Sequence, residues 1–263
     1  MKLTTIFTAL LVAGVCSASA HARDGDSLTV VGTRPIMSMR SGLSMPTQVN
    51  AVDPTAFYSN VTTSSNTGAT AGGTTLVGSN LVTRMLCDDL QFSTTQSIAH
   101  ITGAVFTVVN FDSGTVSFRP SIAFFQNDGI NGGPGTAAGG VTFGSVTLPT
   151  LGATVLSSGP LSSAINVPVD TSNPVVWACQ YFDNDSGITG ATQAQMDNLG
   201  AVFFNPPDIG TSQDLYFGSA GPGSVASDPP GSNQYFGGNP VANFGWELLN
   251  ADGDTIFKDG FDG

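Results

Sequence analysis

From residue 81 onward, apolar and polar side chains alternate with a period of two over many short stretches, which is typical of half-buried β-strands. The clearest example is 116–124 (VSFRPSIAF). Because Pro120 cannot donate a backbone hydrogen bond, we expect this strand to lie at an edge or to bulge there. Residues 101–111 are apolar on both faces and predict a central strand, which a turn at 112–114 joins to 116–124 in a hairpin.

The same alternation predicts further short strands and very little helix. These strands are expected at 85–93, 141–148, 152–157, 164–169, 174–182, 201–204, 213–218 and 242–249. One short helix is expected at 192–199, since Thr192 and Gln195 have the spacing of a capping box and Gly200 follows where the helix would end. The glycine-rich interval 127–140 predicts a loop. We therefore predict an all-β fold, a two-sheet, jelly-roll-like β-sandwich with long Gly/Ser-rich loops and at most one short helix.

Residues 1–22 have the features of a secretory signal peptide. Lys2 supplies a positive charge, residues 6–15 are apolar, and the small residues at 18–22 offer cleavage sites. The apolar stretch is shorter than the roughly 20 residues of a membrane-spanning helix. We expect the mature chain to have no transmembrane segment and to be secreted, either extracellular or periplasmic.

The rest of the chain divides by composition into three parts. Residues 23–80 form an N-terminal extension that ends in a Ser/Thr/Gly-rich loop at 59–80, and we expect it to be part of the sandwich or packed on it. Residues 81–249 contain the predicted strands and form the sandwich domain. Residues 250–263 form an acidic-aromatic C-terminal tail.

The charge of the chain disfavours one class of partner. Lys and Arg total 7 against 19 Asp and Glu, and the net charge of −12 becomes −13 once Lys2 leaves with the signal peptide. Binding to nucleic acid needs clustered cations that displace counterions from the phosphates. We therefore expect no nucleic acid partner.

Two cysteines, Cys87 and Cys179, remain in the mature chain. In an oxidising compartment an isolated pair most simply forms a disulfide, which would close a loop of about 90 residues and stabilise the fold by roughly 4–5 kcal/mol. Two buried free thiols are the alternative. Neither cysteine has a second Cys or a His at ligand spacing, which disfavours a metal site.

Pairs of adjacent aromatic residues recur along the chain. They are Phe57-Tyr58, Phe124-Phe125, Tyr181-Phe182, Phe203-Phe204, Tyr216-Phe217 and Tyr235-Phe236. Neighbours on a strand point to opposite faces, so a sheet with one wet face would expose one ring of each pair, and exposed rings can stack on sugars. The candidate carbohydrate-binding residues are Tyr58, Phe125, Phe182, Tyr216 and Tyr235. The alternative is that both rings are buried, one in the core and one under a loop.

The run 183–187 (DNDSG) places oxygen ligands at alternate positions before a turn glycine, as at the start of a calcium-binding loop. Asp183 and Asp185 are therefore candidate ligands for a structural calcium ion. The alternative is that these residues form turns through their own side chains. Beyond this calcium, we expect no required cofactor.

Side chains suited to catalysis are scarce. The mature chain has one histidine, His100, and one glutamate, Glu247, and contains no G-x-S-x-G nucleophile motif. We expect His100 to be structural. A glycosidase needs two carboxylates, and the candidates are Glu247 with Asp88 or Asp89. Nothing in the sequence brings these acids together, so we expect a non-catalytic protein.

Several stretches of the chain contain closely spaced glycine, proline and aromatic residues. They are 116–125 (VSFRPSIAFF), 132–136 (GGPGT), 182–192 (FDNDSGITGAT), 198–200 (NLG) and 237–247 (GGNPVANFGWE). Together they resemble a group of uncharacterised secreted bacterial β-sandwich proteins, many of which carry C-terminal sorting segments of the PEP-CTERM type. The likeness spans about residues 81–249, and the chain itself shows no such sorting segment. The resemblance implies a β-sandwich and no particular activity.

These observations favour a secreted or surface-exposed, non-catalytic β-sandwich that acts in binding, adhesion or extracellular matrix. Carbohydrate is the favoured ligand, and another cell-surface component is the alternative partner. A hypothesis from another class is an extracellular polysaccharide hydrolase or lyase that uses Glu247 with Asp88 or Asp89. A third is a purely structural surface protein, which would present neither a concave site nor a cluster of exposed rings.

Overall fold

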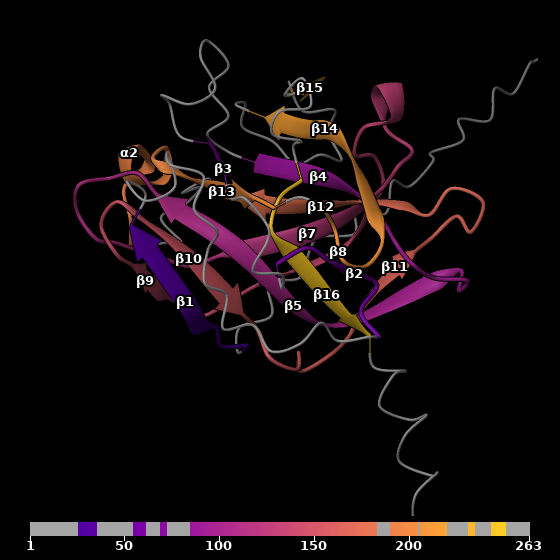
Figure 1. The fold of residues 1–263 in the computed structure, drawn as a ribbon, viewed down its shortest axis with the longest axis horizontal. Helices are drawn as coiled ribbons and strands as arrows, with labels where there is room; N and C mark the ends of the chain where they lie inside the picture. Colours follow the sequence, from indigo (N-terminus) through magenta and orange to yellow (C-terminus); the bar gives the residue numbers. More distant parts are fainter. Residues whose placement is uncertain are drawn as a thin grey trace, which may run out of the picture.

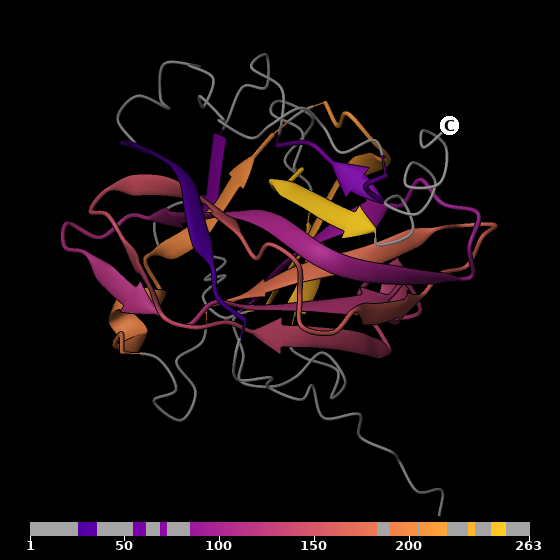
Figure 2. The same ribbon diagram turned by 90° about the horizontal axis from the view of Figure 1, so that it is seen from below.

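The structure is a computed structural model, and it describes residues 26–35, 55–61, 69–72, 85–182, 190–204, 206–219, 231–234 and 243–250. These residues form two large antiparallel β-sheets and a small third one. Figures 1 and 2 show the strands in layers, with the short helix α2 (Gln193–Met196) at one end. The all-β sandwich predicted from the sequence is confirmed.

The first sheet is built around β5 (Ile98–Asn110), which is long enough to pair with four other strands. Its partners are β10 (Gly152–Ser157), β11 (Ile165–Pro168), β13 (Leu199–Phe203) and β16 (Trp246–Asn250). The outer strands of this sheet are β1 (Thr29–Pro35) beside β10, β2 (Tyr58–Ser59) beside β16, and β3 (Ala69–Gly72) beside β13. Figure 1 shows β5 crossing the fold with β16 next to it. The central strand expected at 101–111 is thus confirmed.

The second sheet has six strands. Their order is β15 (Gly231–Gln234), β14 (Thr211–Ser219), β4 (Met85–Gln91), β12 (Val175–Tyr181), β7 (Ser121–Gln126) and β8 (Ala137–Thr142). The pairing of β14 with β4 is irregular between Ser212 and Tyr216, where β14 bulges. The third, two-stranded sheet consists of β6 (Val116–Phe118) and β9 (Val146–Leu148).

Alternation along the strands gives each large sheet an inner and an outer face. On β4, Leu90 belongs to the core that both sheets share, whereas Cys87 belongs to a separate buried cluster on the outer face. On the first sheet, Trp246 faces the shared core and Val105 lies in a buried outer cluster. Both faces of each sheet therefore carry buried apolar side chains.

The predicted hairpin between 101–111 and 116–124 is wrong. The turn itself exists, because the Gly114 N–H donates to Asp112 Oδ1 over 2.8 Å. After it, however, the chain leaves the first sheet: β6 pairs with β9, and β7 joins the second sheet. The break between β6 and β7 falls at Arg119 and Pro120, where a residue without an N–H donor interrupts the strand as expected.

Three other boundaries also differ from prediction. The expected loop at 59–80 contains β3, which pairs with β13, and the loop expected at 127–140 already includes the start of β8. The single strand expected at 141–148 is divided between the end of β8 and β9, and residues 143–145 connect them.

The predicted helix is present but shorter. Its capping box is formed as expected: the Thr192 N–H donates to Gln195 Oε1 over 2.9 Å, and the Gln195 N–H donates to Thr192 Oγ1 over 3.3 Å. Gly200 lies in β13 rather than after the helix, since β13 begins at Leu199. The first pairing partner of Leu199 on β5 is Asn110, so sheet formation ends the helix early.

Candidate functional site

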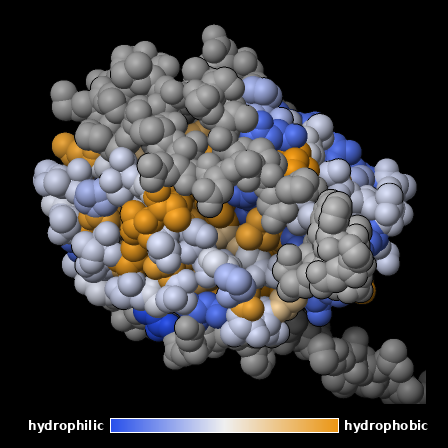
Figure 3. All heavy atoms as spheres, turned by 60° about the horizontal axis from the view of Figure 1, so that its bottom comes forward, coloured by the Kyte–Doolittle hydropathy of each residue, from blue (hydrophilic) through white to orange (hydrophobic). Residues whose placement is uncertain are grey.

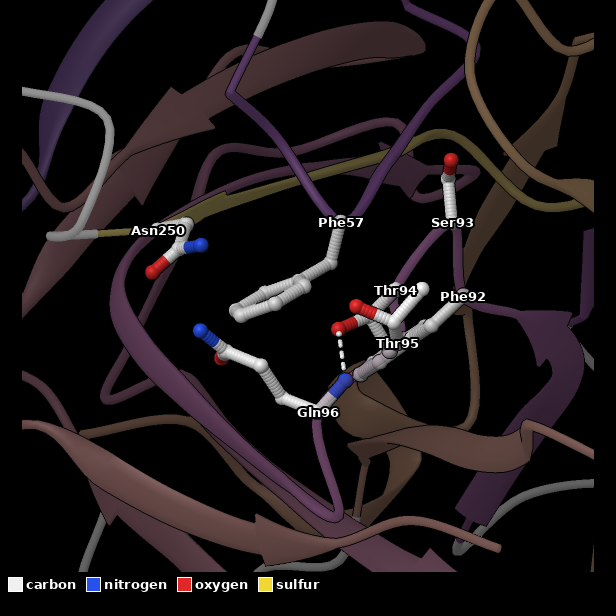
Figure 4. Close-up of a pocket in the computed structure, with 7 residues that line it drawn as sticks. All are labelled: Phe57, Phe92, Ser93, Thr94, Thr95, Gln96 and Asn250. Atoms are coloured by element: carbon white, nitrogen blue, oxygen red, sulfur yellow. Dashed lines mark hydrogen bonds between the residues drawn. The ribbon is translucent and has the colours of Figure 1, made fainter. Parts of the chain in front are cut away.

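A pocket of about 530 Å³ lies where the ends of β2, β4, β5 and β16 come together. Its lining combines two aromatic rings with five uncharged polar side chains. The residues are Phe57, Phe92, Ser93, Thr94, Thr95, Gln96 and Asn250. Figure 4 shows the edge of the Phe57 ring facing the side-chain amides of Gln96 and Asn250. The pocket is thus formed by segments that are far apart in the sequence.

The two rings form the base of the pocket. Phe57 and Phe92 stack with their centroids 5.5 Å apart and an interplanar angle of 14°, and each is only 2% exposed. Their backbones are held by hydrogen bonds: the Ser93 N–H donates to the Phe57 carbonyl over 2.9 Å, and the Phe57 N–H donates to the Leu248 carbonyl over 2.8 Å. The base is therefore fixed from three separate strands or strand ends.

The wall of the pocket is a polar turn at 93–96. The Gln96 N–H donates to Thr94 Oγ1 over 3.1 Å, which holds the turn together (Figure 4). Ser93, Thr95 and Gln96 are exposed at its rim. The described residues of the lining offer hydroxyl and amide groups, which both donate and accept hydrogen bonds, and none of them is charged. Such a lining suits a neutral, hydroxyl-rich ligand.

A second unusual feature is a cluster of buried acids on β4, the strand that leads into Phe92. Asp88 and Asp89 are neighbours on β4 and are 0% and 2% exposed. Alternation directs Asp88 to the inner face of the sheet, with Leu86 and Leu90, and Asp89 to the outer face, with Cys87. Two adjacent acids buried on opposite faces of one strand need partners on both sides of the sheet.

One hydroxyl serves both carboxyls. Ser212 Oγ is 3.1 Å from Asp88 Oδ1 and 3.2 Å from Asp89 Oδ1. Its position next to both follows from the bulge of β14, which begins directly after Ser212. Because of the bulge, the Ser212 side chain lies beside β4 and does not point to one face of the sheet. Backbone groups add one donor each: the Phe244 N–H donates to Asp88 Oδ2 over 2.6 Å, and the Gln213 N–H donates to Asp89 Oδ1 over 3.3 Å.

Asn60 connects the surroundings of this cluster to the first sheet by hydrogen bonds. Its side-chain amide donates to the Tyr58 hydroxyl over 3.1 Å and to the carbonyls of Phe204 and Phe244 over 3.0 and 2.8 Å. Its Oδ1 accepts from the Trp246 N–H over 2.8 Å. One buried side chain therefore satisfies both neighbouring backbones and the tyrosine that lies near the acids.

Burial shifts the ionisation of this group. It raises the pKa of Asp88 well above its ordinary value, and the neighbouring Asp89 raises it further. Burial raises the pKa of Asp89 to about 7, although hydrogen bonds from Ser212 and Gln213 partly oppose the shift. Burial and the two acids raise the pKa of Tyr58 well above 10. At neutral pH the cluster is therefore only partly ionised.

The structure does not bring Glu247 together with the other predicted carboxylates. Glu247 pairs with Ser59 and Val105, and its neighbours Trp246 and Leu248 point into the shared core, so Glu247 is buried on the outer face of the first sheet. Asp88 lies on the inner face of the second sheet. The two-carboxylate geometry of a glycosidase is thus not formed by Glu247 and Asp88.

The expectation that one ring of each aromatic pair is exposed is wrong for four candidate residues. Tyr58, Phe125, Phe182 and Tyr216 are only 0–3% exposed. The reason is that both faces of each sheet are covered: Phe125, for example, lies in the outer cluster beside Trp177, whose Nε1–H donates to Asn127 in the following loop. Tyr235 lies outside the described residues.

The remaining predicted sites have different outcomes. The disulfide between Cys87 and Cys179 is confirmed. Asp183 and Asp185 lie outside the described residues, and within the described ranges no group of three or more His, Cys, Asp or Glu side chains is placed to hold a metal ion. The calcium site stays a prediction. His100 Nδ1 lies 2.7 Å from Asn166 Oδ1 on the paired strand β11.

Among the residues that the structure describes, four large apolar side chains are exposed, and Figure 3 shows a face on which apolar residues reach the surface. They are Val30, Ile98, Ile130 and Leu151. They come from different elements, and single exposed apolar residues are normal on protein surfaces. They do not identify a second binding site.

Most of the residues described above were not predicted from the sequence. Phe92, the polar turn after it and Asn250 were not singled out, and neither were Ser212 and Asn60. The adjacent polar run STTQ at 93–96 directly after an aromatic residue was the available signal for the pocket wall. Nothing in the sequence signals Ser212, because its role depends on a bulge.

Comparison with known proteins finds no relative: no family model, no curated protein and no solved structure matches this chain. In the part of the chain that the structure describes, no helix has the length and apolar character of a membrane span. The function must therefore be argued from the chemistry of the pocket.

Proposed function

We propose that this protein is a secreted, non-catalytic binding protein whose pocket takes a neutral, hydroxyl-rich ligand of the carbohydrate class. The observation that carries the proposal is the pocket at Phe57 and Phe92, whose lining, among the residues that the structure describes, consists of hydroxyl and amide groups without a charged side chain. Sugars are recognised by such planar polar groups, which donate and accept hydrogen bonds with little desolvation cost compared with a charge. The pocket volume of about 530 Å³ is in the range of small-molecule sites.

The aromatic component differs from the exposed platform expected from the sequence. Phe57 and Phe92 are nearly buried, so they offer ring edges at the base of the pocket and not an open stacking surface. Specificity would then come from the hydrogen-bonding turn at 93–96 and from Asn250 on the opposite side. This arrangement favours the end or a single unit of a glycan over a long chain lying flat on a sheet.

Other observations support a secreted, non-catalytic role. The apparent signal peptide at 1–22 and the disulfide agree with an oxidising compartment. The acids that burial has made least ionised, Asp88 and Asp89, lie below the surface instead of lining the pocket. A carboxyl that acts on a substrate must lie within hydrogen-bonding reach of it, directly or through one water.

The test is a titration of the mature protein with neutral mono- and oligosaccharides, followed by ¹H–¹⁵N NMR. Binding should shift the amide signals of 92–96 and of Asn250. The Gln96→Ala variant should weaken binding at least about tenfold, because it removes an amide from the rim. Thr147→Ala, which removes an exposed hydroxyl from β9, is the control and should bind normally. Shifts spread over other surfaces, or equal affinity of Gln96→Ala and the control, would contradict the proposal.

A further inference from the structure

The pocket and the acid cluster are built on the same two strands. β4 carries Asp88 and Asp89 and runs directly into Phe92, and β2 begins with Tyr58, which directly follows Phe57. The Ser93 N–H···O=C bond to Phe57 joins the two strand ends at the pocket. Any movement of β4 against β2 at the acids must therefore reach the base of the pocket within a few residues.

We infer that the Asp88–Asp89 pair, bridged by Ser212, is a proton-controlled latch on the pocket. With one proton on the pair, β2 and β4 are held together and the pocket keeps its shape. With both carboxyls ionised, the contact loosens and the pocket opens. The inference rests on the proposed function for the meaning of the pocket, but the latch itself does not depend on the identity of the ligand.

The hydrogen-bond count of the cluster carries the inference. Ser212 has a single hydroxyl proton, yet its oxygen lies within 3.2 Å of an oxygen of each acid. If both acids are ionised, the hydroxyl can donate to only one of them, and the other faces an oxygen without a proton between them. If one acid is protonated, its own O–H donates to Ser212 Oγ while Ser212 donates to the second carboxylate. If both are protonated, each O–H donates to Ser212 Oγ while Ser212 donates to the Gln213 carbonyl, which is 3.3 Å away. Only a pair that keeps at least one proton therefore satisfies all three groups.

The groups around the pair reinforce this preference. Tyr58 from β2 and Asp214 from β14 both act on the cluster, and Asp214 adds a like charge that raises the pKa of Asp89. From β14, Tyr216 lies opposite Asp88, and burial raises its pKa to about 12, so it stays neutral in the physiological range. From β12, Ala178 and Trp177 lie opposite the two acids and bring no charge.

The location of the cluster agrees with a latch between the sheets. The Phe244 N–H, which donates to Asp88, belongs to the segment that enters β16 in the first sheet, whereas Asp88 and Ser212 belong to the second sheet. With a pKa of about 7, Asp89 changes its proton occupancy near neutral pH. The ordinary range of an aspartate would leave it ionised throughout, and no such switch would exist.

The test is amide hydrogen exchange of the ligand-free mature protein between pH 5 and pH 8, with rates corrected for intrinsic exchange. The amides of Phe92 and Ser93 report the pocket, and those of Ser117 and Phe118 on β6 report the distant part of the fold. Where the closed pair holds one proton that the open form does not, the opening equilibrium rises about tenfold per pH unit. Protection at Ser93 should therefore fall by about that factor per unit as pH rises toward 7, through an opening of lower free energy than the one that exposes β6.

Asn has the shape of a protonated Asp and cannot ionise, so Asp89→Asn should keep the latch closed and make protection at Ser93 depend less steeply on pH. Asp88→Asn is the second variant, with the same expectation if Asp89→Asn does not fold. Asp170→Asn is the control: this surface acid has a lowered pKa and should leave the pH dependence as in the wild type. A wild type without pH dependence at Ser93, a dependence as steep in both variants as in the wild type, or the same opening free energy at Ser93 and β6 would each overturn the inference. Because no sugar is added, these outcomes are separate from failure of ligand binding.

Discussion

Cys87 and Cys179 lie directly opposite each other on the neighbouring antiparallel strands β4 and β12 and are joined by a disulfide. Their Cα atoms are 3.9 Å apart, and both side chains belong to the apolar cluster on the outer face of the second sheet. The next residue after Cys87 is Asp88. The disulfide therefore fixes the position of β4 in the sheet directly before Asp88 and Asp89, whose side chains point to opposite faces.

Removal of this disulfide should destabilise the protein strongly. The two cysteines are 92 positions apart in the sequence, and loss of a native disulfide typically costs about 2–5 kcal/mol. The Cys87→Ser/Cys179→Ser variant should unfold at a clearly lower urea concentration than the oxidised wild type. Non-reducing electrophoresis should also show faster migration of the wild type than after reduction. Identical mobility, with both thiols open to alkylation after unfolding, would contradict the bridge.

Global stability should fall as pH rises from about 4 to about 7. The folded-state pKa values of Asp88 and Asp89 are raised, that of Asp89 to about 7, so the folded protein binds more protons than the unfolded chain in this window. The stabilising contribution is complete below the unfolded pKa near 4 and is lost as pH rises through the folded values. The free energy of unfolding should fall by up to about 1.4 kcal/mol per pH unit for each proton that the folded protein binds and the unfolded chain does not.

Urea unfolding at pH 5, 6 and 7 measures this slope. It should flatten in Asp89→Asn and remain in Asp170→Asn, whose acid has a lowered pKa and therefore titrates below this window. Stability that rises with pH across the same window would mean that the two buried acids are ionised in the folded protein.

Asn60 should be among the least replaceable polar residues of the fold. Asn60→Asp keeps the size of the side chain but replaces its donors with a carboxylate that faces the carbonyls of Phe204 and Phe244 and lies near Asp88. Leaving these carbonyls unpaired beside a buried charge should cost about 3 kcal/mol or more. Thermal unfolding measures the loss. The control Asn173→Ala, in an exposed turn, should change stability by no more than about 0.5 kcal/mol.

The fold class could be predicted from the sequence because strand periodicity is a local property. The strand expected at 152–157 coincides with β10, and the apolar run at 101–111 became the central β5. The choice of partner strand is not local. The turn at 112–114 forms, yet the chain beyond it joins another sheet, because Pro120 breaks the strand and β5 pairs with four strands from elsewhere in the chain.

The site was harder to predict for two physical reasons. The carbohydrate hypothesis assumed one wet face per sheet, whereas Phe125 and Trp177 show that the outer face is packed as well. The pocket and the acid cluster depend on contacts such as Ser93 with Phe57, which join residues from separate strands. Asp88 and Asp89 were chosen as candidate acids, but only the bulge that brings Ser212 to both of them makes the pair unusual.

Gly210 should be intolerant of any side chain, for a steric reason as well as a conformational one. Its φ is +74°, and an added Cβ would lie 2.5 Å from the Gln91 carbonyl oxygen and 2.9 Å from the Tyr58 ring. Gly159 has a similar φ of +56° with nothing within 4 Å of an added Cβ. Gly159→Ala should therefore cost only about 1–2 kcal/mol for the left-handed backbone, whereas Gly210→Ala should cost at least about 3 kcal/mol. Urea unfolding with an unchanged m-value measures the difference, and equal losses would show that the backbone at Gly210 moves away from Gln91 without resistance. Because Tyr58 is also displaced, Gly210→Ala should in addition disturb the acid cluster, which Gly159→Ala leaves untouched.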